Sequence, residues 1–142
     1  MGVGRKSRMM KNSIRVQILF SYQGVSYSPS TIIDLDSYLE KSEPIPAYYH
    51  LVARDNAIDT YSYQYEVMEV AEVHFSDAQG LAQKFCQDKN FDMDGFKSDW
   101  QNNRVFEKLS IIAKNHFDVD DLNQNKKLKD ALFEAYELSS KI

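Results

Sequence analysis

A run of alternating apolar and polar residues near the N-terminus constrains the fold more than any other feature of the chain. Apolar side chains occupy every second position of this run, at Ile14, Val16, Ile18, Phe20 and Tyr22. A period of two is typical of a strand with one buried face. Gln23-Gly24 then supplies a tight turn, because glycine accepts the positive φ that two-residue hairpin loops need. Since the following residues alternate again, the sequence predicts a β-hairpin over about 14–36.

Pro29 lies inside the second strand of this hairpin. Proline has no N–H to donate to a ladder, so strands that contain it are usually edge strands or carry a bulge. We therefore expect the second strand to form an edge of the sheet, or to bulge at Pro29.

The chain changes pattern after Ser42. Pro44 and Pro46 disfavour continued pairing, but Pro46 is acceptable in the first turn of a helix. We therefore expect a short helix from 46 to about 55. It should end near Asn56, a residue type that accepts the left-handed conformation of a helix C-terminus.

From Asp59 to Phe75 the period of two returns, which predicts a long third strand. On this reading Tyr61, Tyr63 and Tyr65 share a face with Val67 and line the core. Glu69 is the discordant member of the apolar face, and a bulge near it would account for this.

The rest of the chain has helical patterns. Ser76 and Gln79 match a capping box, which predicts a helix over roughly 77–88, and apolar spacing predicts another over about 98–115. A last helix should present one face made of Leu128, Ala131, Leu132, Ala135, Tyr136 and Ser139. The order β-β-α-β-α-α-α predicts an α+β fold, a small, mainly antiparallel sheet packed against about four helices. The pattern leaves the topology of the sheet open.

Length and charge define the expected organisation. A chain of 142 residues is of ordinary size for one domain. Residues 1–15 contain five basic and no acidic residues, and because the net charge is −4, the rest of the chain carries −9. We expect a basic, disordered arm over 1–13 and a single α+β domain over 14–142. The acidic body argues against nucleic-acid binding, which relies on clustered Lys and Arg.

Several classes of protein are excluded or disfavoured. The single cysteine, Cys86, cannot form an intrachain disulfide, so a disulfide-framed secreted fold is excluded. No apolar run of about 18 residues is present, so we expect no membrane span. The chain is therefore expected to be cytoplasmic.

The motifs of cofactor and metal sites are missing from the sequence. It contains neither G-x-x-x-x-G-K-[ST] nor G-x-G-x-x-G, the usual phosphate-binding loops. The acidic strings that begin at Asp92 and Asp118 lack the ligands of a calcium loop and are better explained as helix starts. The histidines and Cys86 are scattered singly rather than spaced as zinc ligands. We expect no cofactor and no metal, and we expect Cys86 to be a small buried apolar residue.

The strongest candidate for a site is the segment 48–65, which contains five of the nine tyrosines. If 46–55 is helical, His50 and Arg54 lie one turn apart on an exposed face. Asp55 and Asp59 follow in the connection to the next strand, and a histidine near carboxylates suits acid–base chemistry. The predicted binding residues are Tyr48, His50, Arg54, Asp55, Asp59 and Tyr61.

Three functions are consistent with these features. The first is a non-enzymatic protein-interaction module, for a protein partner or for self-association as a homodimer, that uses these tyrosines and an exposed sheet edge. The second is a small hydrolase or isomerase with His50 as general base, oriented by Asp55 or Asp59, and Arg54 holding an anionic substrate. The third is an acidic protein that binds a basic partner. We favour the interaction module.

Overall fold

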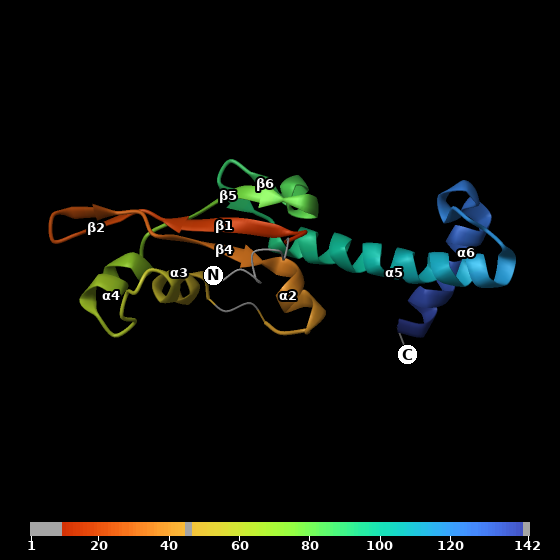
Figure 1. The fold of residues 1–142 in the computed structure, drawn as a ribbon, viewed down its shortest axis with the longest axis horizontal. Coiled ribbons are helices and arrows are strands. Elements are labelled where there is room, and N and C mark those ends of the chain that lie inside the picture. Colours follow the sequence, from red (N-terminus) through yellow and green to blue (C-terminus); the bar gives the residue numbers. More distant parts are fainter. Residues whose placement is uncertain (1–9, 45–46, 141–142) are drawn as a thin grey trace, which may run out of the picture. The chain divides into compact units, whose positions relative to one another are not determined.

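The computed structural model describes residues 10–44 and 47–140 and has an α+β fold, as predicted (Figure 1). The chain divides into two compact units, Met1–Phe96 and Lys97–Ile142. Residues 1–9 of the predicted basic arm lie outside the described part of the chain. The expectation of a single domain over 14–142 stays a prediction.

The N-terminal hairpin is confirmed. Strand β1 (Ser13–Ile18) pairs antiparallel with β4 (Ser30–Asp34), and the hairpin continues through β2 (Phe20–Tyr22) and β3 (Val25–Tyr27). The turn residues Gln23 and Gly24 both have positive φ. The first strand buries the predicted face, with fully buried side chains at Ile14, Val16 and Ile18 and a nearly buried one at Phe20. On the returning strand Ile33 is buried, whereas half of the surface of Val25 is exposed.

A third strand completes an antiparallel sheet of order β4-β1-β5. Strand β5 (Val73–Gln79) pairs with β1, so β4 is an end strand, as Pro29 predicted. The other side of β5 is approached by a small hairpin of β6 (Cys86–Gln87) and β7 (Asn90–Phe91), where the Phe75 amide donates to the Lys89 carbonyl at 2.9 Å.

Three short helices belong to the same unit as this sheet: α2 (Leu35–Glu40), α3 (Tyr48–Asp55) and α4 (Tyr63–Glu69). Helix α3 confirms the predicted helix and packs on β1 and β4 through Leu51, Val52 and Ala53, all buried. The helix ends where predicted, with Asn56 directly after its last residue, but the left-handed conformation expected at Asn56 is wrong. Asn56 has a φ of −117° and the next residue, Ala57, has the positive φ instead.

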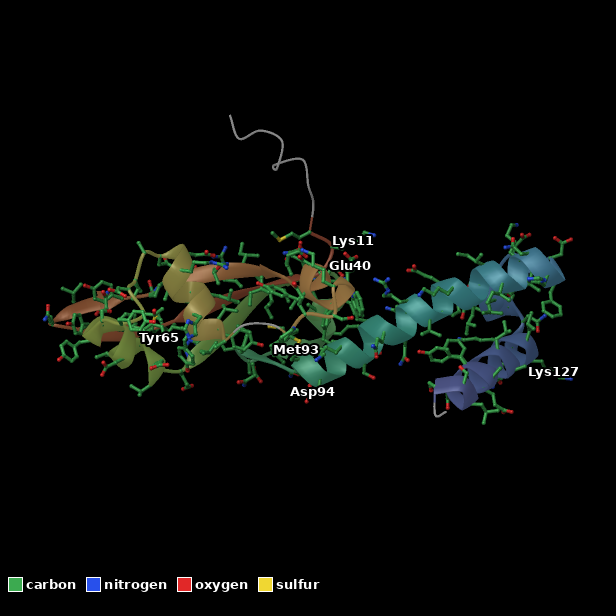
Figure 2. All side chains as sticks on the ribbon, turned by 90° about the horizontal axis from the view of Figure 1, so that it is seen from below. Lys11, Glu40, Tyr65, Met93, Asp94 and Lys127 are labelled. Carbon is green, nitrogen blue, oxygen red and sulfur yellow. The ribbon has the colours of Figure 1, made fainter. Side chains whose placement is uncertain are left out.

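The predicted long strand over 59–75 is wrong. Its first half is helix α4, and only residues from Val73 onward join the sheet. The Ser62 hydroxyl accepts from the Tyr65 amide at 3.1 Å and caps the helix, which buries Tyr65 and Met68 one turn apart. Tyr61 and Tyr63 are 94% and 76% exposed. Of the three tyrosines expected in the core, Tyr65 alone lies there (Figure 2).

The predicted helix over 77–88 is also wrong. Ser76 lies in β5 opposite Arg15, so no capping box forms. The strand ends at Gln79, and the next residue, Gly80, has a φ of +68° and leaves no room for a Cβ against the Lys11 carbonyl. A 3-10 turn (Gly80–Phe85) follows, and Cys86 lies in β6 rather than on a helix.

Helix α5 (Met93–Phe117) contains the predicted helix over 98–115 and begins earlier, at the acidic string expected to be a helix start (Figure 2). The Asp92 carboxylate accepts from the Gly95 amide at 3.0 Å, as a cap does. Among the described residues, no helix is both long enough and apolar enough to span a bilayer.

The unit from Lys97 onward contains most of α5, a 3-10 turn (Leu122–Gln124) and α6 (Lys126–Ser140). Its core is formed by Leu109, Ala113 and Leu122, with Phe106 and Phe133 packed against it. The face predicted for the last helix is only partly correct. Leu128 and Leu132 are half-buried, whereas Ala131, Ala135, Tyr136 and Ser139 are exposed.

Candidate functional site at the open edge of strand β4

The open edge of β4 can be identified from its hydrogen bonds to β1. Ile18 donates to the Pro29 carbonyl and Leu35 donates to the Asn12 carbonyl, both at 3.0 Å. Bonded and non-bonded pairs alternate in an antiparallel ladder, so the residues of β4 that face β1 are Thr31 and Ile33. The backbone groups of Ser30 and Ile32 therefore point away from the sheet. The Ser30 carbonyl agrees with this, because it accepts from the Asn56 side chain at 2.9 Å.

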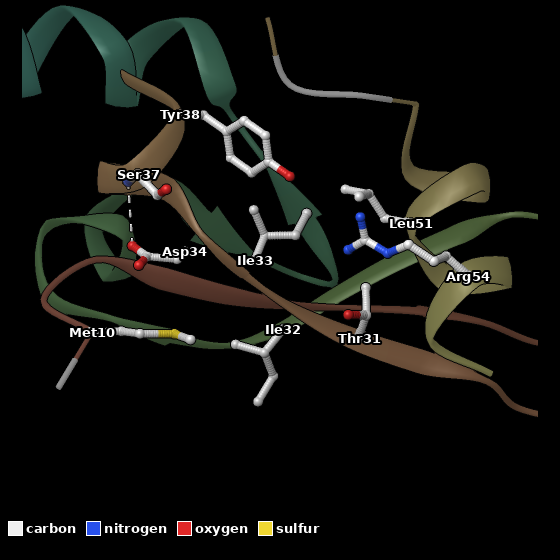
Figure 3. A pocket seen from close by; sticks show the side chains of 9 residues that line it. All are labelled: Met10, Thr31, Ile32, Ile33, Asp34, Ser37, Tyr38, Leu51 and Arg54. Carbon is white, nitrogen blue, oxygen red and sulfur yellow. Dashed lines mark hydrogen bonds between the residues drawn. The ribbon is translucent and has the colours of Figure 1, made fainter. Parts of the chain in front are cut away.

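A hollow of about 210 Å³ lies along this edge (Figure 3). It is lined by four consecutive residues, 31–34, although neighbouring side chains of a strand point to opposite faces. A hollow that touches both kinds of residue must lie at the edge of the strand. The other walls come from Met10, from Ser37 and Tyr38 of α2, and from Leu51 and Arg54 of α3. The outward backbone groups of Ile32 and the side chains of the hollow are thus available to the same ligand, whereas the Ser30 carbonyl is bound by Asn56.

Two polar groups face each other across the hollow. Figure 3 shows the guanidinium of Arg54 and the hydroxyl of Tyr38 directed toward the space between α2 and α3. Ile33 and Leu51 form the apolar floor between them, and both are nearly buried. A cation and a hydroxyl over an apolar floor can bind a carboxylate that is attached to an aliphatic stem.

Arg54 is held by its neighbour in the chain. Its Nε donates to the Asp55 carboxylate at 3.2 Å, and the Asp55 carboxylate also accepts from the hydroxyl of Thr31. Because the contact with Asp55 uses Nε, the far end of the fork points into the hollow. The Arg54 side chain is two-thirds exposed, so this ion pair contributes little stability and leaves the guanidinium accessible.

Asp34 is the acidic residue of the hollow. Its carboxylate accepts from the Ser37 amide at 3.4 Å and caps helix α2, as the dashed line in Figure 3 shows. A negative charge at a helix N-terminus is favourable, so this carboxylate is occupied by a structural role. Arg54 is therefore the cation that a ligand would meet in the hollow, whereas the Asp34 carboxylate is bound to the N-terminus of α2.

The structure does not join His50 to the predicted carboxylates. His50 is exposed on α3, and its ring lies 5.6 Å from the ring of Tyr65. Asp55 is bound by Thr31 and Arg54, while Asp59 accepts from the Tyr61 amide at 2.9 Å in the turn before α4. His50 is not among the residues that line the hollow. The acid–base site therefore stays a prediction with no added geometric support.

The two tyrosines among the predicted binding residues have different environments. Tyr48 packs edge-on against Phe75 at 5.2 Å between ring centres, and burial raises the pKa of its hydroxyl. Tyr61 lies almost wholly in solvent before α4. Of the six predicted residues, Arg54 lines the hollow, and Asp55 contacts Arg54 by accepting a hydrogen bond from its Nε.

Sequence reasoning missed Thr31, Ile32 and Tyr38 as site residues. Pro29 was a usable signal, because it marked the strand as an edge. Arg54, the basic residue in the last turn of α3, is then a candidate for a ligand contact at the same strand edge. Nothing in the spacing of Tyr38 indicated that α2 would bring it opposite Arg54.

Metal and thiol chemistry receive no support from the described residues. No group of three or more His, Cys, Asp or Glu side chains among them is arranged to hold a metal ion. Burial, with a smaller contribution from Asp77, raises the pKa of the Cys86 thiol. A raised pKa lowers the thiolate fraction and therefore the reactivity of the thiol.

Comparisons of the chain with protein-family models, with curated proteins and with solved structures find no match.

Proposed function

We propose that this protein is a non-enzymatic interaction module that binds an extended segment of a partner protein along the open edge of β4. An acidic group of that segment, a side chain or a C-terminal carboxylate, would occupy the hollow beside Arg54. The observation that carries this proposal is the coincidence of outward backbone groups at Ile32 with the Arg54 hollow. Strand addition uses both kinds of contact, backbone bonds for affinity and side-chain pockets for specificity.

The chemistry of Arg54 supports the choice of an acidic group. A guanidinium presents a planar fork of donors that matches a carboxylate, and such charged bonds are stronger than neutral ones. Ile33 and Leu51 provide apolar surface for the stem that carries the carboxylate. An acidic residue that follows an aliphatic one, or an acidic C-terminus, therefore fits this hollow best.

A panning experiment tests the proposal. The full chain is immobilised and panned with displayed random peptides of about nine residues, a length that spans roughly 30 Å when extended. Enriched peptides are then labelled and titrated by fluorescence anisotropy. We expect enrichment of acidic residues at one position, and a loss of about tenfold or more in affinity for Arg54→Gln. Arg54→Lys should restore only part of the loss, because lysine keeps the charge but lacks the fork.

A proline substitution tests the role of the backbone. Ile32→Pro removes an outward N–H without removing a bond to β1, and proline is tolerated on edge strands in that position. Ile32→Thr is the matched control, since it changes the side chain and keeps the N–H. We expect Ile32→Pro to abolish peptide binding and Ile32→Thr to preserve it. Circular dichroism checks that both variants are folded, and peptides N-methylated at single positions test the same bonds from the ligand side.

Three results would overturn the proposal. The first is the absence of any enriched peptide. The second is equal binding of enriched peptides by the wild type, Arg54→Gln and Ile32→Pro. The third is a dimer, seen by light scattering, that Ile32→Pro converts to monomer, because the edge would then be occupied by a second copy of the chain.

A further inference from the structure

A second hollow lies along the same hairpin strand, closer to the turn at Gln23-Gly24. It has a volume of about 400 Å³ and is lined by residues 26–29 on one side and by residues 56–58 with Gln64 on the other. The Arg54 hollow is lined by residues 31–34 and by α3 in the same way. The two hollows therefore follow one another along β3 and β4, and both are bounded by α3 or the segment that leads from it to α4.

Asn56 separates the two hollows and fixes their spacing. Its side-chain nitrogen donates both of its hydrogens, one to the Ser30 carbonyl at 2.9 Å and one to the Val52 carbonyl at 2.8 Å. These bonds tie the edge strand to α3 between the hollows. The side-chain oxygen of Asn56 keeps its capacity to accept a hydrogen bond, and Asn56 is one of the residues that line the second hollow.

The second hollow differs from the first in chemistry. The residues that line it carry no charged side chain. Its polar groups are the hydroxyls of Ser26, Tyr27 and Ser28 and the amides of Asn56 and Gln64. Pro29 and Ile58 add apolar surface. Such a lining suits an uncharged side chain that both donates and accepts hydrogen bonds, such as a hydroxyl or a carboxamide.

We infer that the second hollow is a second subsite for the same extended partner segment, and that it takes an uncharged hydrogen-bonding side chain. This inference rests on the proposed function of the β4 edge. The centres of the two lining segments are five residues apart, roughly 17 Å in a strand. Both hollows lie toward the helices, so both ligand side chains lie on one face of the ligand strand. The alternation of a strand then requires the acidic and the uncharged position to be about four or six positions apart in the ligand sequence.

The test compares peptides of two lengths on matched variants. A peptide that Arg54→Gln weakens is shortened to remove its uncharged half, and both lengths are titrated by fluorescence anisotropy. Gln64→Trp fills the second hollow, and Glu66→Trp places the same bulk on α4 at a residue outside the lining. We expect Gln64→Trp to weaken the long peptide about tenfold, to the affinity of the short one, and to leave the short peptide unchanged. Glu66→Trp should change neither.

The possible failures are distinguishable. If long and short peptides bind equally, or if Gln64→Trp and Glu66→Trp behave alike, the second subsite is overturned while the Arg54 site stands. If no peptide loses affinity with Arg54→Gln, the proposed function fails and this inference fails with it. Gln64→Ala supplies a second variant with little risk of misfolding, and it should weaken the long peptide alone.

Discussion

The hydroxyl of Thr31 donates a hydrogen bond to the carboxylate of Asp55, and this bond fastens the end of helix α3 to strand β4. The same carboxylate accepts a hydrogen bond from the Nε of Arg54 at 3.2 Å. Asp55 therefore links a residue of the edge strand to the cation of the hollow. The position of the guanidinium depends on a hydroxyl that does not itself need to touch a ligand.

Substitution of Thr31 by valine should remove the hydrogen bond to Asp55 while the packing of the buried side chain is kept. Thr31 is nearly buried, and valine has about the same volume without the hydroxyl. We expect Thr31→Val to lower the free energy of unfolding by about 1 kcal/mol, because one hydrogen bond to a partly solvated carboxylate is lost. Urea unfolding followed by circular dichroism measures this change. Thr31→Ser retains the hydroxyl, so the Thr31 interpretation is wrong if serine fails to preserve Arg54-dependent peptide binding better than valine does.

Gly80 and Gly24 offer a matched pair of backbone substitutions. Both have positive φ, +68° and +76°, a conformation that costs an ordinary residue about 1–2 kcal/mol. An added Cβ at Gly24 meets nothing within 4 Å, whereas at Gly80 it would lie 2.1 Å from the Lys11 carbonyl oxygen. We expect Gly24→Ala to cost about 1 kcal/mol and Gly80→Ala about 3 kcal/mol or more. Thermal and urea unfolding of both variants give the comparison, and equal costs would contradict the close packing at Gly80.

The hairpin could be predicted from the sequence because its signal is local and redundant. Alternation, a Gln23-Gly24 turn and an edge proline all indicate the same structure, and each rests on the geometry of a few adjacent residues. Helix α3 was predictable for a similar reason, since Pro46 allows a helix to begin and no alternation competes with it. The α+β class was predicted from the order of all the elements, and it is correct although two of those elements were assigned wrongly.

The segment 59–79 could not be assigned from its sequence because two periods compete there. Tyr61, Tyr63 and Tyr65 alternate as in a strand, but Tyr65 and Met68 also have helical spacing, and tertiary packing decides between them. The start of the strand β5 is then set by the pairing with β1, a contact between distant parts of the chain. The site was half predictable for the same reason. Arg54 and Asp55 belong to a predictable helix, whereas the position of Tyr38 in the same hollow as Arg54 depends on how α2 and α3 each pack on the sheet.

Substitution of Ser62 tests the helix that replaced the predicted strand. The Ser62 hydroxyl accepts from the Tyr65 amide and donates to the Asp59 carbonyl at 2.6 Å. Loss of an N-cap costs about 1 kcal/mol, so Ser62→Ala should lower the free energy of unfolding by that amount and speed amide exchange at Tyr65. Ser62→Thr keeps both bonds and serves as the control. In a strand, by contrast, threonine would be favoured over serine and the alanine variant would not affect the Tyr65 amide selectively.

The buried hydroxyl of Tyr65 should make stability depend on alkaline pH. Tyr65 is 4% exposed, and its hydroxyl has no hydrogen-bond partner among the described residues. Burial, and then the nearby Glu69 carboxylate, raise the pKa of this phenol above its usual 10.0. The folded state therefore keeps the proton at a pH where the unfolded chain has lost it. The stability that depends on this proton is complete below pH 10.0 and falls as the pH rises above it.

Tyr65→Phe should remove this pH dependence and leave stability at neutral pH equal or higher, because a buried hydroxyl without a partner costs free energy. Tyr61→Phe is the control, since its side chain is 94% exposed and its loss should change neither quantity. Urea unfolding at neutral and at alkaline pH measures both variants against the wild type. A Tyr65→Phe protein that loses stability above pH 10.0 as steeply as the wild type would show that another group, such as the half-buried Tyr48, controls the alkaline transition.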